Sequence, residues 1–256
     1  MSQAKRKNIL VVDDEINVCK SMRQAILSEN YAVDMALSGE EALAMDKNNP
    51  YDMVITDLMM PGISGVDLLT SLKISRPAVI VIMVTGYPTI RTAVQTIKSG
   101  AFDYIPKPFT PDELRGLVAR AFKKSQATRE GKIDQLPPMP QNLFCLRGHT
   151  WLREEGANRV TVGVVYEFLQ NIDQISAIEL LAENKSVFQG EVCARLIDAR
   201  GHIHRIWSPA SGRISQTNPA VPRDLGLLRR DPYGEGWLLR LETTDLATDL
   251  EGLIPS

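Results

Sequence analysis

The sequence predicts a doubly wound α/β domain with a parallel sheet, followed by a separate β-rich domain. Two observations support the first domain: short apolar runs of β type alternate with helical periodicity, and this unit repeats five times before residue 125. A third observation supports the second: after about residue 143 the chain consists of short β-like runs punctuated by Gly and Pro. The 256 residues are enough for two domains that each bury a core.

Five β-type runs are expected to form the parallel sheet. They occupy residues 8–12, 31–36, 51–56, 78–84 and 101–105. Residues 9–12 and 79–84 are apolar throughout, which is typical of strands that helices cover on both faces. An open parallel sheet of this kind binds ligands beyond the carboxyl ends of its strands, at the topological switch point.

Helices are expected between these strands. One apolar stripe consists of Val18, Met22, Ala25 and Ile26, and another of Ile90, Ala93, Val94 and Ile97. The second stripe has the i, i+3, i+4, i+7 spacing of an amphipathic helix. The last helix begins near Thr110, which is placed to cap it, while Pro111 suits the first helical position and Glu113 completes a capping box.

The helical pattern fails near Ser125, where a polar stretch leads into a cluster of prolines. We therefore expect the first domain at residues 1–126, a semi-rigid linker at 127–143 and the second domain at 144–256. The β-like runs of the second domain lie at residues 159–165, 175–180 and 237–242, with a helix near 166–171.

The composition excludes several classes of protein. Residues 1–125 hold 15 Lys and Arg against 14 Asp and Glu, and the remainder holds 14 against 17, so neither half has the basic excess typical of nucleic-acid binding. No apolar run is long enough to span a bilayer or to form a signal peptide, so we expect a cytoplasmic protein without membrane contact. Three separated cysteines, an odd number, fit reduced thiols.

Polar residues follow the predicted strands at the edge where ligands are expected. Asp13 and Asp14 end the first strand and Asp57 ends the third. Thr85 ends the fourth strand, and Lys107 follows the fifth. Because carboxylates held close together repel each other, such a cluster requires a cation. Oxygen ligands with room for water favour Mg²⁺.

These residue types together suit phosphoryl transfer. Asp57 would attack phosphorus as the nucleophile, while the metal and Lys107 offset the negative charge. Thr85 would donate a hydrogen bond to the bound phosphoryl group. Taken singly, Asp13 and Asp14 could be a solvated loop and Asp57 a helix cap. Their occurrence in register favours the chemical interpretation.

Residues 8–122 closely resemble the receiver domains of bacterial two-component response regulators. The matching segments are ILVVDDE, DMVITDLMMPGISG, VIMVTGYP and GAFDYIPKPF, in the order and spacing of that family. The resemblance implies a flavodoxin-like (βα)5 fold and a sensor histidine kinase that phosphorylates Asp57. The metal ligands that it implies are Asp13, Asp14, Asp57 and the backbone carbonyl of Met59. It also implies that Lys107 contacts the phosphoryl group and that its bond to Pro108 is cis.

The resemblance further assigns a switch pair, Thr85 and Tyr104. Phosphorylation of Asp57 would draw Thr85 inward and let Tyr104 move from an exposed to a buried position. This would reshape a surface that often mediates dimerisation in the family, so a phosphorylation-dependent homodimer is one expected outcome. We also hypothesise that the bulk of Met59 and Tyr87 hinders an attacking water and prolongs the lifetime of the phosphoryl group.

Residues 148–253 resemble the H protein of the glycine cleavage system, a barrel-sandwich hybrid fold that carries lipoic acid on a lysine. The matching segments are GHTWLREEG, RVTVGVVYEFLQNIDQI, ENKSVFQGEV, SPASGRISQTNPAV and DPYGEGWLLRLE. Counting from these anchors places the lipoyl position at Arg200 or Gly201, and neither residue can be lipoylated. The lysines after residue 126 are Lys132 and Lys185, both well before the expected hairpin, so no lipoyl cofactor is expected.

The histidines of the second domain allow two interpretations. His202 and His204 alternate along a strand, and Cys193 or Cys145 could join them around a soft metal. Their spacing matches no established zinc pattern, so partly exposed hairpin residues are the preferred interpretation. His149 matches a histidine of the family, and we expect it to have a structural role.

The expected function is signalling through altered protein–protein contacts, without an enzymatic activity. The second domain would be a protein-interaction module with an unknown protein partner. One alternative is a phosphate sink or relay intermediate whose second domain is a passive scaffold. Another is a transcriptional or metabolic regulator acting through a partner, although the sequence shows no helix-turn-helix with a basic recognition helix. A lipoyl carrier would require modification of Lys185.

Overall fold

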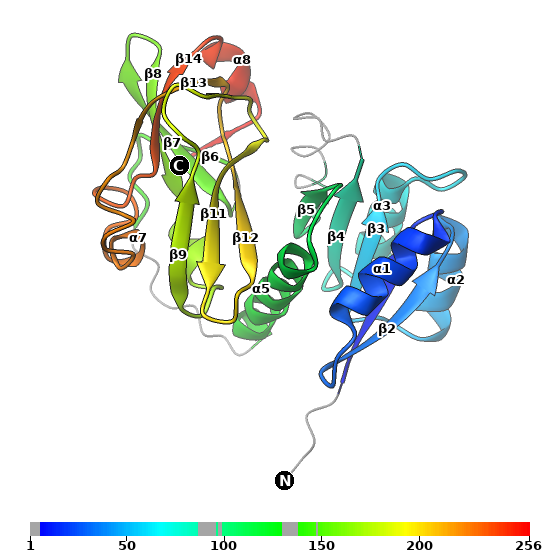
Figure 1. Ribbon diagram of the computed structural model, residues 1–256. Coiled ribbons are helices and arrows are strands. Elements are labelled where there is room, and N and C mark those ends of the chain that lie inside the picture. The colour runs from blue at the N-terminus through cyan, green and yellow to red at the C-terminus, as the bar shows by residue number, and fades with distance from the viewer. Residues whose placement is uncertain (1–5, 87–95, 97–98, 130–137, 147) are drawn as a thin grey trace. The chain divides into compact units, whose positions relative to one another are not determined.

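The computed structural model describes residues 6–86, 96, 99–129, 138–146 and 148–256 (Figure 1). It divides into two compact units, residues 1–121 and 122–256. The predicted helical stripe around Ile90 and Val94 lies outside the described residues. Among the described residues, no helix combines the length and the apolar character needed to cross a membrane.

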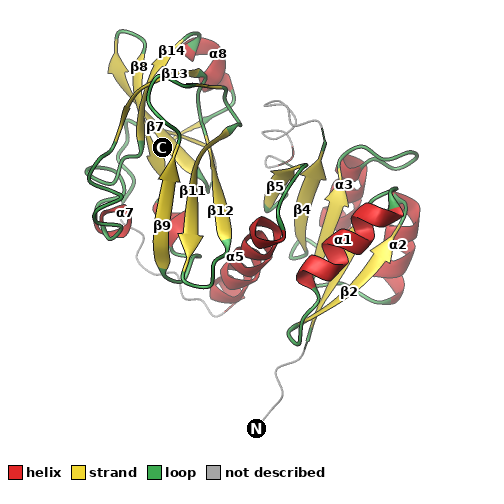
Figure 2. Ribbon diagram, viewed as in Figure 1, coloured by secondary structure: helices red, strands yellow, loops and turns green. Residues whose placement is uncertain are grey.

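The first unit is a five-stranded sheet in the order β2-β1-β3-β4-β5, and all its strand pairs are parallel. The strands are β1 (Lys7–Val12), β2 (Tyr31–Ala36), β3 (Met53–Asp57), β4 (Ile80–Thr85) and β5 (Asp103–Pro106). The described helices are α1 (Ile16–Ile26), α2 (Gly39–Asn48), α3 (Gly65–Ser75) and α5 (Pro111–Arg129). Helices cover both faces of the sheet, which confirms the predicted doubly wound α/β fold (Figures 1 and 2).

Burial and capping explain why these segments form these elements. Residues 9–12 of β1 are completely buried, as their continuous apolar character predicts. At the start of α5 the Thr110 amide donates to the Glu113 carboxylate at 2.8 Å, and the Glu113 amide donates to the Thr110 hydroxyl at 3.3 Å. This reciprocal pair is the predicted capping box.

The boundary between the domains differs from the prediction at both of its ends. Helix α5 continues to Arg129, so residues 127–129 of the predicted linker are helical, because no helix breaker occurs before Gly131. Residues 130–137 lie outside the described part of the chain. Leu143 is already buried in the second core, and its carbonyl accepts a hydrogen bond from the Ser256 amide at 2.9 Å. The second domain therefore begins about one residue before the predicted 144.

The second unit contains two antiparallel sheets. The larger has the strand order β10-β13-β14-β8-β7-β6-β15, and the smaller has the order β12-β11-β9. Its strands are β6 (Phe144–Leu146), β7 (Thr150–Gly156), β8 (Arg159–Val164), β9 (Ile175–Leu180), β10 (Ser186–Val187), β11 (Val192–Asp198), β12 (Ile203–Trp207), β13 (Gly212–Thr217), β14 (Leu239–Thr243) and β15 (Ile254–Pro255). Its short helices are α6 (Tyr166–Leu169), α7 (Leu227–Arg230) and α8 (Leu246–Glu251). The prediction of a β-rich second domain is confirmed.

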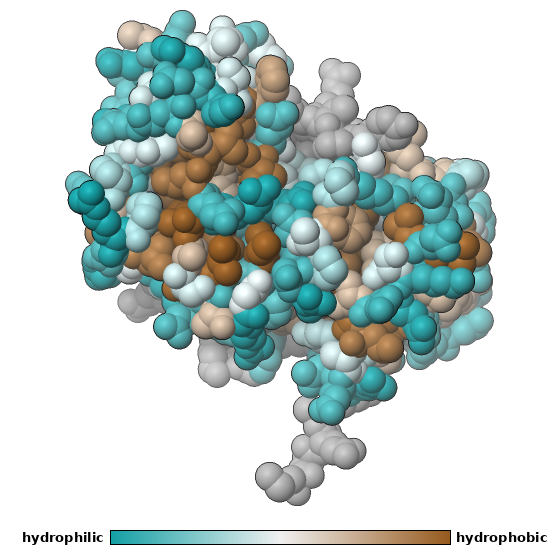
Figure 3. Space-filling model, viewed as in Figure 1, coloured by the Kyte–Doolittle hydropathy of each residue, from teal (hydrophilic) through white to brown (hydrophobic). Residues whose placement is uncertain are grey.

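One core joins the two sheets of the second unit. Trp151 and Phe168 are among its largest fully buried side chains. Apolar side chains also gather on the visible surface over the three-stranded sheet (Figure 3), where Ile175, Ile178 and Leu180 are only partly buried. Most of the large apolar side chains are nevertheless buried, as a stable β-rich domain requires.

Candidate functional site

Three aspartates meet at the carboxyl end of the parallel sheet. Asp13 directly follows β1, and Asp57 is the last residue of the adjacent strand β3. One carboxylate oxygen from each of Asp13, Asp14 and Asp57 lies within 4.8 Å of the others. Asp13 and Asp57 are buried, whereas Asp14 is exposed and leaves one side of the cluster open. The sequence prediction that these residues converge is therefore correct.

Lys107 bridges the two buried aspartates. Its Nζ donates to Oδ2 of Asp13 and to Oδ2 of Asp57, at 2.7 Å in each case. The Lys107 amide donates to the carbonyl of Thr85 at 2.7 Å, which ties the end of β5 to the end of β4. The Lys107–Pro108 peptide bond is cis, as the resemblance implied.

The charges of this cluster do not balance. Burial raises the pKa of Asp13 above its ordinary value, even though the hydrogen bond from Lys107 lowers it. Burial lowers the pKa of Lys107, but the hydrogen bonds to Asp13 and Asp57 more than offset this and raise it. Three carboxylates face one ammonium group, so the site favours an additional cation.

The donor set fits Mg²⁺. All three clustered side chains offer oxygen atoms, and the exposed Asp14 leaves room for water, which Mg²⁺ usually retains. The backbone amide of Met59 donates to Oδ1 of Asp57 at 3.3 Å, which places the Met59 backbone beside the cluster. Coordination by the Met59 carbonyl stays a prediction.

In the second unit, a hairpin between β11 and β12 occupies the predicted lipoyl position. Its tip contains Arg200, whose side chain is 71% exposed, and Gly201, whose φ of 82° lies in the left-handed region that glycine favours. Lys185 is exposed and precedes β10, so it lies outside this hairpin. The hairpin is present, but it offers no amine to carry a lipoyl group.

Both parts of the chain match models of known protein families. The model of the response regulator receiver domain matches residues 9–119, and the model of the glycine cleavage H-protein matches residues 143–255. The chain joins a receiver domain to an H-protein domain. The predicted families are thus confirmed, with receiver boundaries close to those of the sequence segments.

Individual relatives match the receiver half. Transcriptional regulatory protein ResD of Bacillus subtilis is 37% identical over 129 residues, which cover 49% of this chain and 53% of ResD. Transcriptional regulatory protein ZraR of Salmonella typhimurium is 32% identical over 47% of this chain and 27% of ZraR. A receiver domain structure from Clostridium thermocellum is 32% identical, with a TM-score of 0.45, over 48% of this chain and 98% of that one. The chain thus spans about half of ResD and about a quarter of ZraR.

The predicted switch residues of the receiver domain are both buried. Thr85 ends β4 and is 3% exposed, and Tyr104 on β5 is 4% exposed. The resemblance predicts that Tyr104 is exposed before phosphorylation. The structure instead holds Tyr104 in the buried position predicted for the phosphorylated state, and burial of its aromatic ring favours this position. Tyr87, the predicted neighbour of the phosphoryl group, lies outside the described residues.

Two further residues shape the aspartate cluster and were not singled out from the sequence. A Cβ atom at Gly65 would lie 2.0 Å from the Asp57 carbonyl oxygen, so only glycine lets α3 begin this close to the phosphoacceptor. The Cys19 thiol donates to the carbonyl of Asp13 at 3.4 Å, and burial raises the pKa of Cys19 to about 11. The signal for Gly65 was present in the segment DLMMPGISG, whereas Cys19 has no local signature.

In the H-protein domain, Asp198 organises the hairpin. Its Oδ1 accepts hydrogen bonds from the amides of Arg200 at 2.9 Å and His202 at 3.0 Å. Its Oδ2 lies 3.0 Å from Nδ1 of His202 and 3.2 Å from Nε2 of His204. The two histidines therefore share a carboxylate partner.

The described residues do not include a metal site that combines His202 and His204 with Cys193 or Cys145. Within the described ranges, the aspartate cluster of the receiver domain is the one group of three or more potential ligands that lie close together. His149 is buried, and its ring centroid lies 4.6 Å from that of Phe168. This packing is consistent with the expected structural role of His149.

Proposed function

We propose that this chain is a response regulator of a two-component phosphorelay in the cytoplasm, in which Asp57 accepts a phosphoryl group from a sensor histidine kinase. The observation that carries the proposal is the Lys107 ammonium group placed 2.7 Å from both Asp13 and Asp57. This arrangement provides a nucleophile and a cation for the incoming phosphoryl oxygens at one point of the sheet.

The chemistry is a single displacement. A carboxylate oxygen of Asp57 attacks the phosphorus of a phosphohistidine, the P–N bond breaks, and its electron pair stays on the imidazole nitrogen. Lys107 offsets the negative charge of the transferred group, and the Thr85 hydroxyl donates a hydrogen bond to it. Mg²⁺ held by Asp13, Asp14, Asp57 and the Met59 carbonyl would supply further charge neutralisation.

The phosphorylated state would act through protein–protein contacts and not through catalysis. About two negative charges added at Asp57 bias Thr85 toward the phosphoryl group and hold Tyr104 buried. A homodimer that forms on phosphorylation is one expected consequence. The H-protein domain would serve as a non-lipoylated interaction module, since the lipoyl position expected from the family falls on Arg200 or Gly201 and neither is a lysine. The absence of a basic excess supports a protein partner and not a nucleic acid.

The decisive experiment measures phosphorylation of the full chain. With Mg²⁺ and acetyl phosphate, or with a promiscuous histidine kinase, intact mass spectrometry should detect one added phosphoryl group in the wild-type chain and none in Asp57→Asn. Absence of the added mass in the wild type would refute the proposal.

A second experiment seeks the protein that the H-protein domain binds when the receiver domain is phosphorylated. Proteins captured from native extract in the presence of beryllofluoride, but not in its absence, would identify the partner of the H-protein domain. An identical set of captured proteins in both states would favour the alternative of a phosphate sink with a passive second domain.

A further inference from the structure

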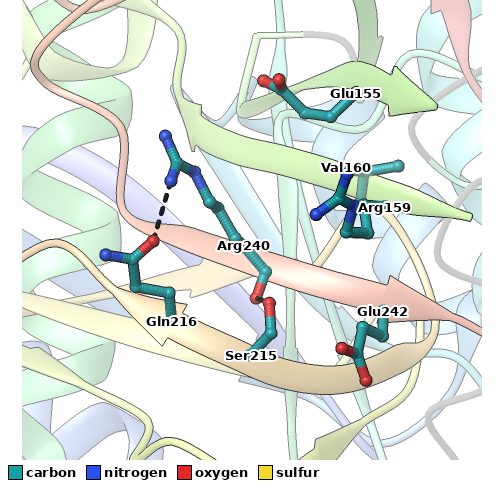
Figure 4. A pocket seen from close by; sticks show the side chains of 7 residues that line it. All are labelled: Glu155, Arg159, Val160, Ser215, Gln216, Arg240 and Glu242. Atoms are coloured by element: carbon teal, nitrogen blue, oxygen red, sulfur yellow. Dashed lines mark hydrogen bonds between the residues drawn. The ribbon is translucent and has the colours of Figure 1, made fainter. Parts of the chain in front are cut away.

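A polar pocket of about 380 Å³ lies on the seven-stranded sheet of the H-protein domain (Figure 4). Its lining residues come from β7, β8, β13 and β14 and are Glu155, Arg159, Val160, Ser215, Gln216, Arg240 and Glu242. Along β14, Leu239 and Leu241 are buried, whereas Arg240 and Glu242 are exposed. The pocket therefore lies on the sheet face that is turned away from the core.

Two arginines of this pocket are close neighbours on the sheet. Arg159 lies directly opposite Glu242 across the β8–β14 pair, and Arg240 lies directly opposite Thr161. Side chains alternate between the two faces of a strand, so Arg159 and Arg240 share one face at diagonal positions. Diagonal positions are about 7–8 Å apart, within reach of two long side chains. Both guanidinium groups can therefore contact the same bound group.

The glutamates of the pocket already have cationic partners. Glu155 accepts hydrogen bonds from the Thr161 hydroxyl at 2.9 Å and from Arg153 at 3.3 Å. The hydrogen bond from Thr161 has the largest effect in holding the pKa of Glu155 below its ordinary value, and Arg153 and the charge of Arg240 add to it. Glu242 forms an ion pair with Arg213 at 2.8 Å. Arg153 and Arg213 do not line the pocket, so the closest cationic partner of each glutamate lies outside it.

The two lining arginines form no ion pair of this kind among the described residues, although the charge of Arg240 also lowers the pKa of Glu155. In the part of the chain that the structure describes, neither Arg159 nor Arg240 has a carboxylate oxygen within 4.0 Å. Arg240 is nevertheless held in place, because it donates to the Gln216 side chain at 2.8 Å and lies 4.6 Å from the Trp237 ring centroid. Like charges at neighbouring positions on a sheet repel each other, and a bound anion would remove this cost.

We propose that this pocket binds the phosphate group of a small hydroxylated phosphate ester through Arg159 and Arg240. A guanidinium group offers two parallel donors that match phosphate oxygens, and two such groups balance a phosphate dianion. The amide nitrogen of Gln216 is a further donor for the phosphate. One oxygen each of Glu155 and Glu242 remains to accept hydrogen bonds from ligand hydroxyls. The volume lies within the range of about 300–1,000 Å³ that is typical of small-ligand sites.

This site is independent of the proposed function of the receiver domain, since all of its residues belong to the H-protein domain. A purely structural arrangement of charges would explain the Arg153–Glu155 pair within β7 and the cross-strand pair of Arg213 and Glu242. It would not explain why two further arginines line one pocket when, among the described residues, neither has a carboxylate oxygen within 4.0 Å.

The test is a titration of the full chain with glycerol 3-phosphate in Mg²⁺-free buffer, measured by calorimetry and by tryptophan fluorescence. The fluorescence should report binding because Arg240 contacts Trp237. Saturable binding is expected in the wild type and in Asp57→Asn. Arg159→Gln and Arg240→Gln should each weaken it about tenfold or more, the equivalent of a charge-assisted hydrogen bond. Arg223→Gln, which changes an exposed arginine that does not line the pocket, should bind like the wild type.

Three results would overturn the proposal. These are a wild-type chain without saturable binding, pocket variants that bind as well as the wild type, and malonate or unphosphorylated glycerol that binds as tightly as glycerol 3-phosphate. Thermal unfolding of each variant shows whether a loss of binding reflects a loss of structure.

Discussion

Asp198 of the H-protein domain and Asp13 of the receiver domain are both buried carboxylates, but their surroundings are opposite. Two amides and two imidazole rings surround Asp198, and although burial raises its pKa, the hydrogen bonds led by the His202 amide hold that pKa below its ordinary value. Asp13 shares one lysine with Asp57, and burial raises its pKa.

This difference separates a structural carboxylate from a functional one. The chain itself supplies every partner that Asp198 needs, so the hairpin is complete without a ligand. The aspartate cluster carries more negative charge than its single lysine can balance, so its stability and its chemistry depend on a cation from solution. An unbalanced charge is thus a stronger indicator of function than burial alone.

The largest expected effect is the loss of phosphorylation in Asp57→Asn. Removing the nucleophilic oxygen should abolish incorporation from acetyl phosphate, because no other step can replace the displacement at phosphorus. Asp198→Asn is the matched control, and it should be phosphorylated at the wild-type rate. Phosphorylation that persists in Asp57→Asn, or that is lost in Asp198→Asn, would contradict the assignment of the two sites.

The next effect concerns stability. Asp198→Asn should lower the free energy of unfolding of the H-protein domain by about 1–3 kcal/mol, because it removes a charged acceptor from buried donors. Tryptophan fluorescence during urea unfolding reports on this domain alone, since Trp151, Trp207 and Trp237 are the three tryptophans of the chain. Glu179→Gln, at an exposed ion pair with Arg195, is the control and should change stability by less than about 0.5 kcal/mol.

The pH dependence of urea unfolding tests whether the negative charge of Asp198 stabilises the H-protein domain. The lowered pKa of Asp198 means that its contribution is complete above the unfolded-state pKa of about 3.9 and is lost as the pH falls through the lower folded-state pKa. The wild-type domain should therefore lose more stability than Asp198→Asn on acidification below about pH 4. Parallel pH profiles would show that Asp198 is not a charged acceptor.

A smaller effect of opposite sign is expected at Asp13. Without Mg²⁺, Asp13→Asn should leave the stability of the receiver domain unchanged or raise it by up to about 1 kcal/mol, because it removes a poorly compensated buried charge. Mg²⁺ should stabilise the wild type by mass action and the variant much less. Far-UV circular dichroism follows this transition, and the tryptophan signal identifies the separate transition of the H-protein domain. Strong destabilisation by Asp13→Asn without metal would mean that Asp13, like Asp198, is a structural carboxylate.

The two sites also differ in how far the sequence predicts them. Asp13, Asp57 and Lys107 come together because each lies at the carboxyl end of a strand of the parallel sheet, and these strands can be inferred from local patterns. The partners of Asp198 depend on which strand residues face each other, and this register is not visible in one sequence. The buried position of Tyr104 could not be predicted either, because it depends on tertiary packing and not on local pattern.

The smallest effect is kinetic and concerns the lifetime of the phosphorylated state. Met59 is 63% exposed, and its amide donates to Asp57, so its side chain lies near the path of a water that would attack the phosphoryl group. Met59→Ala should therefore speed phosphoryl loss roughly threefold, which corresponds to less than about 1 kcal/mol in the barrier. The measurement is the decay of phosphorylated protein after removal of acetyl phosphate. Ile74→Ala, at an exposed apolar residue of α3, is the control and should decay like the wild type. Equal decay rates in Met59→Ala and the wild type would show that this side chain does not shield the phosphoryl group from water.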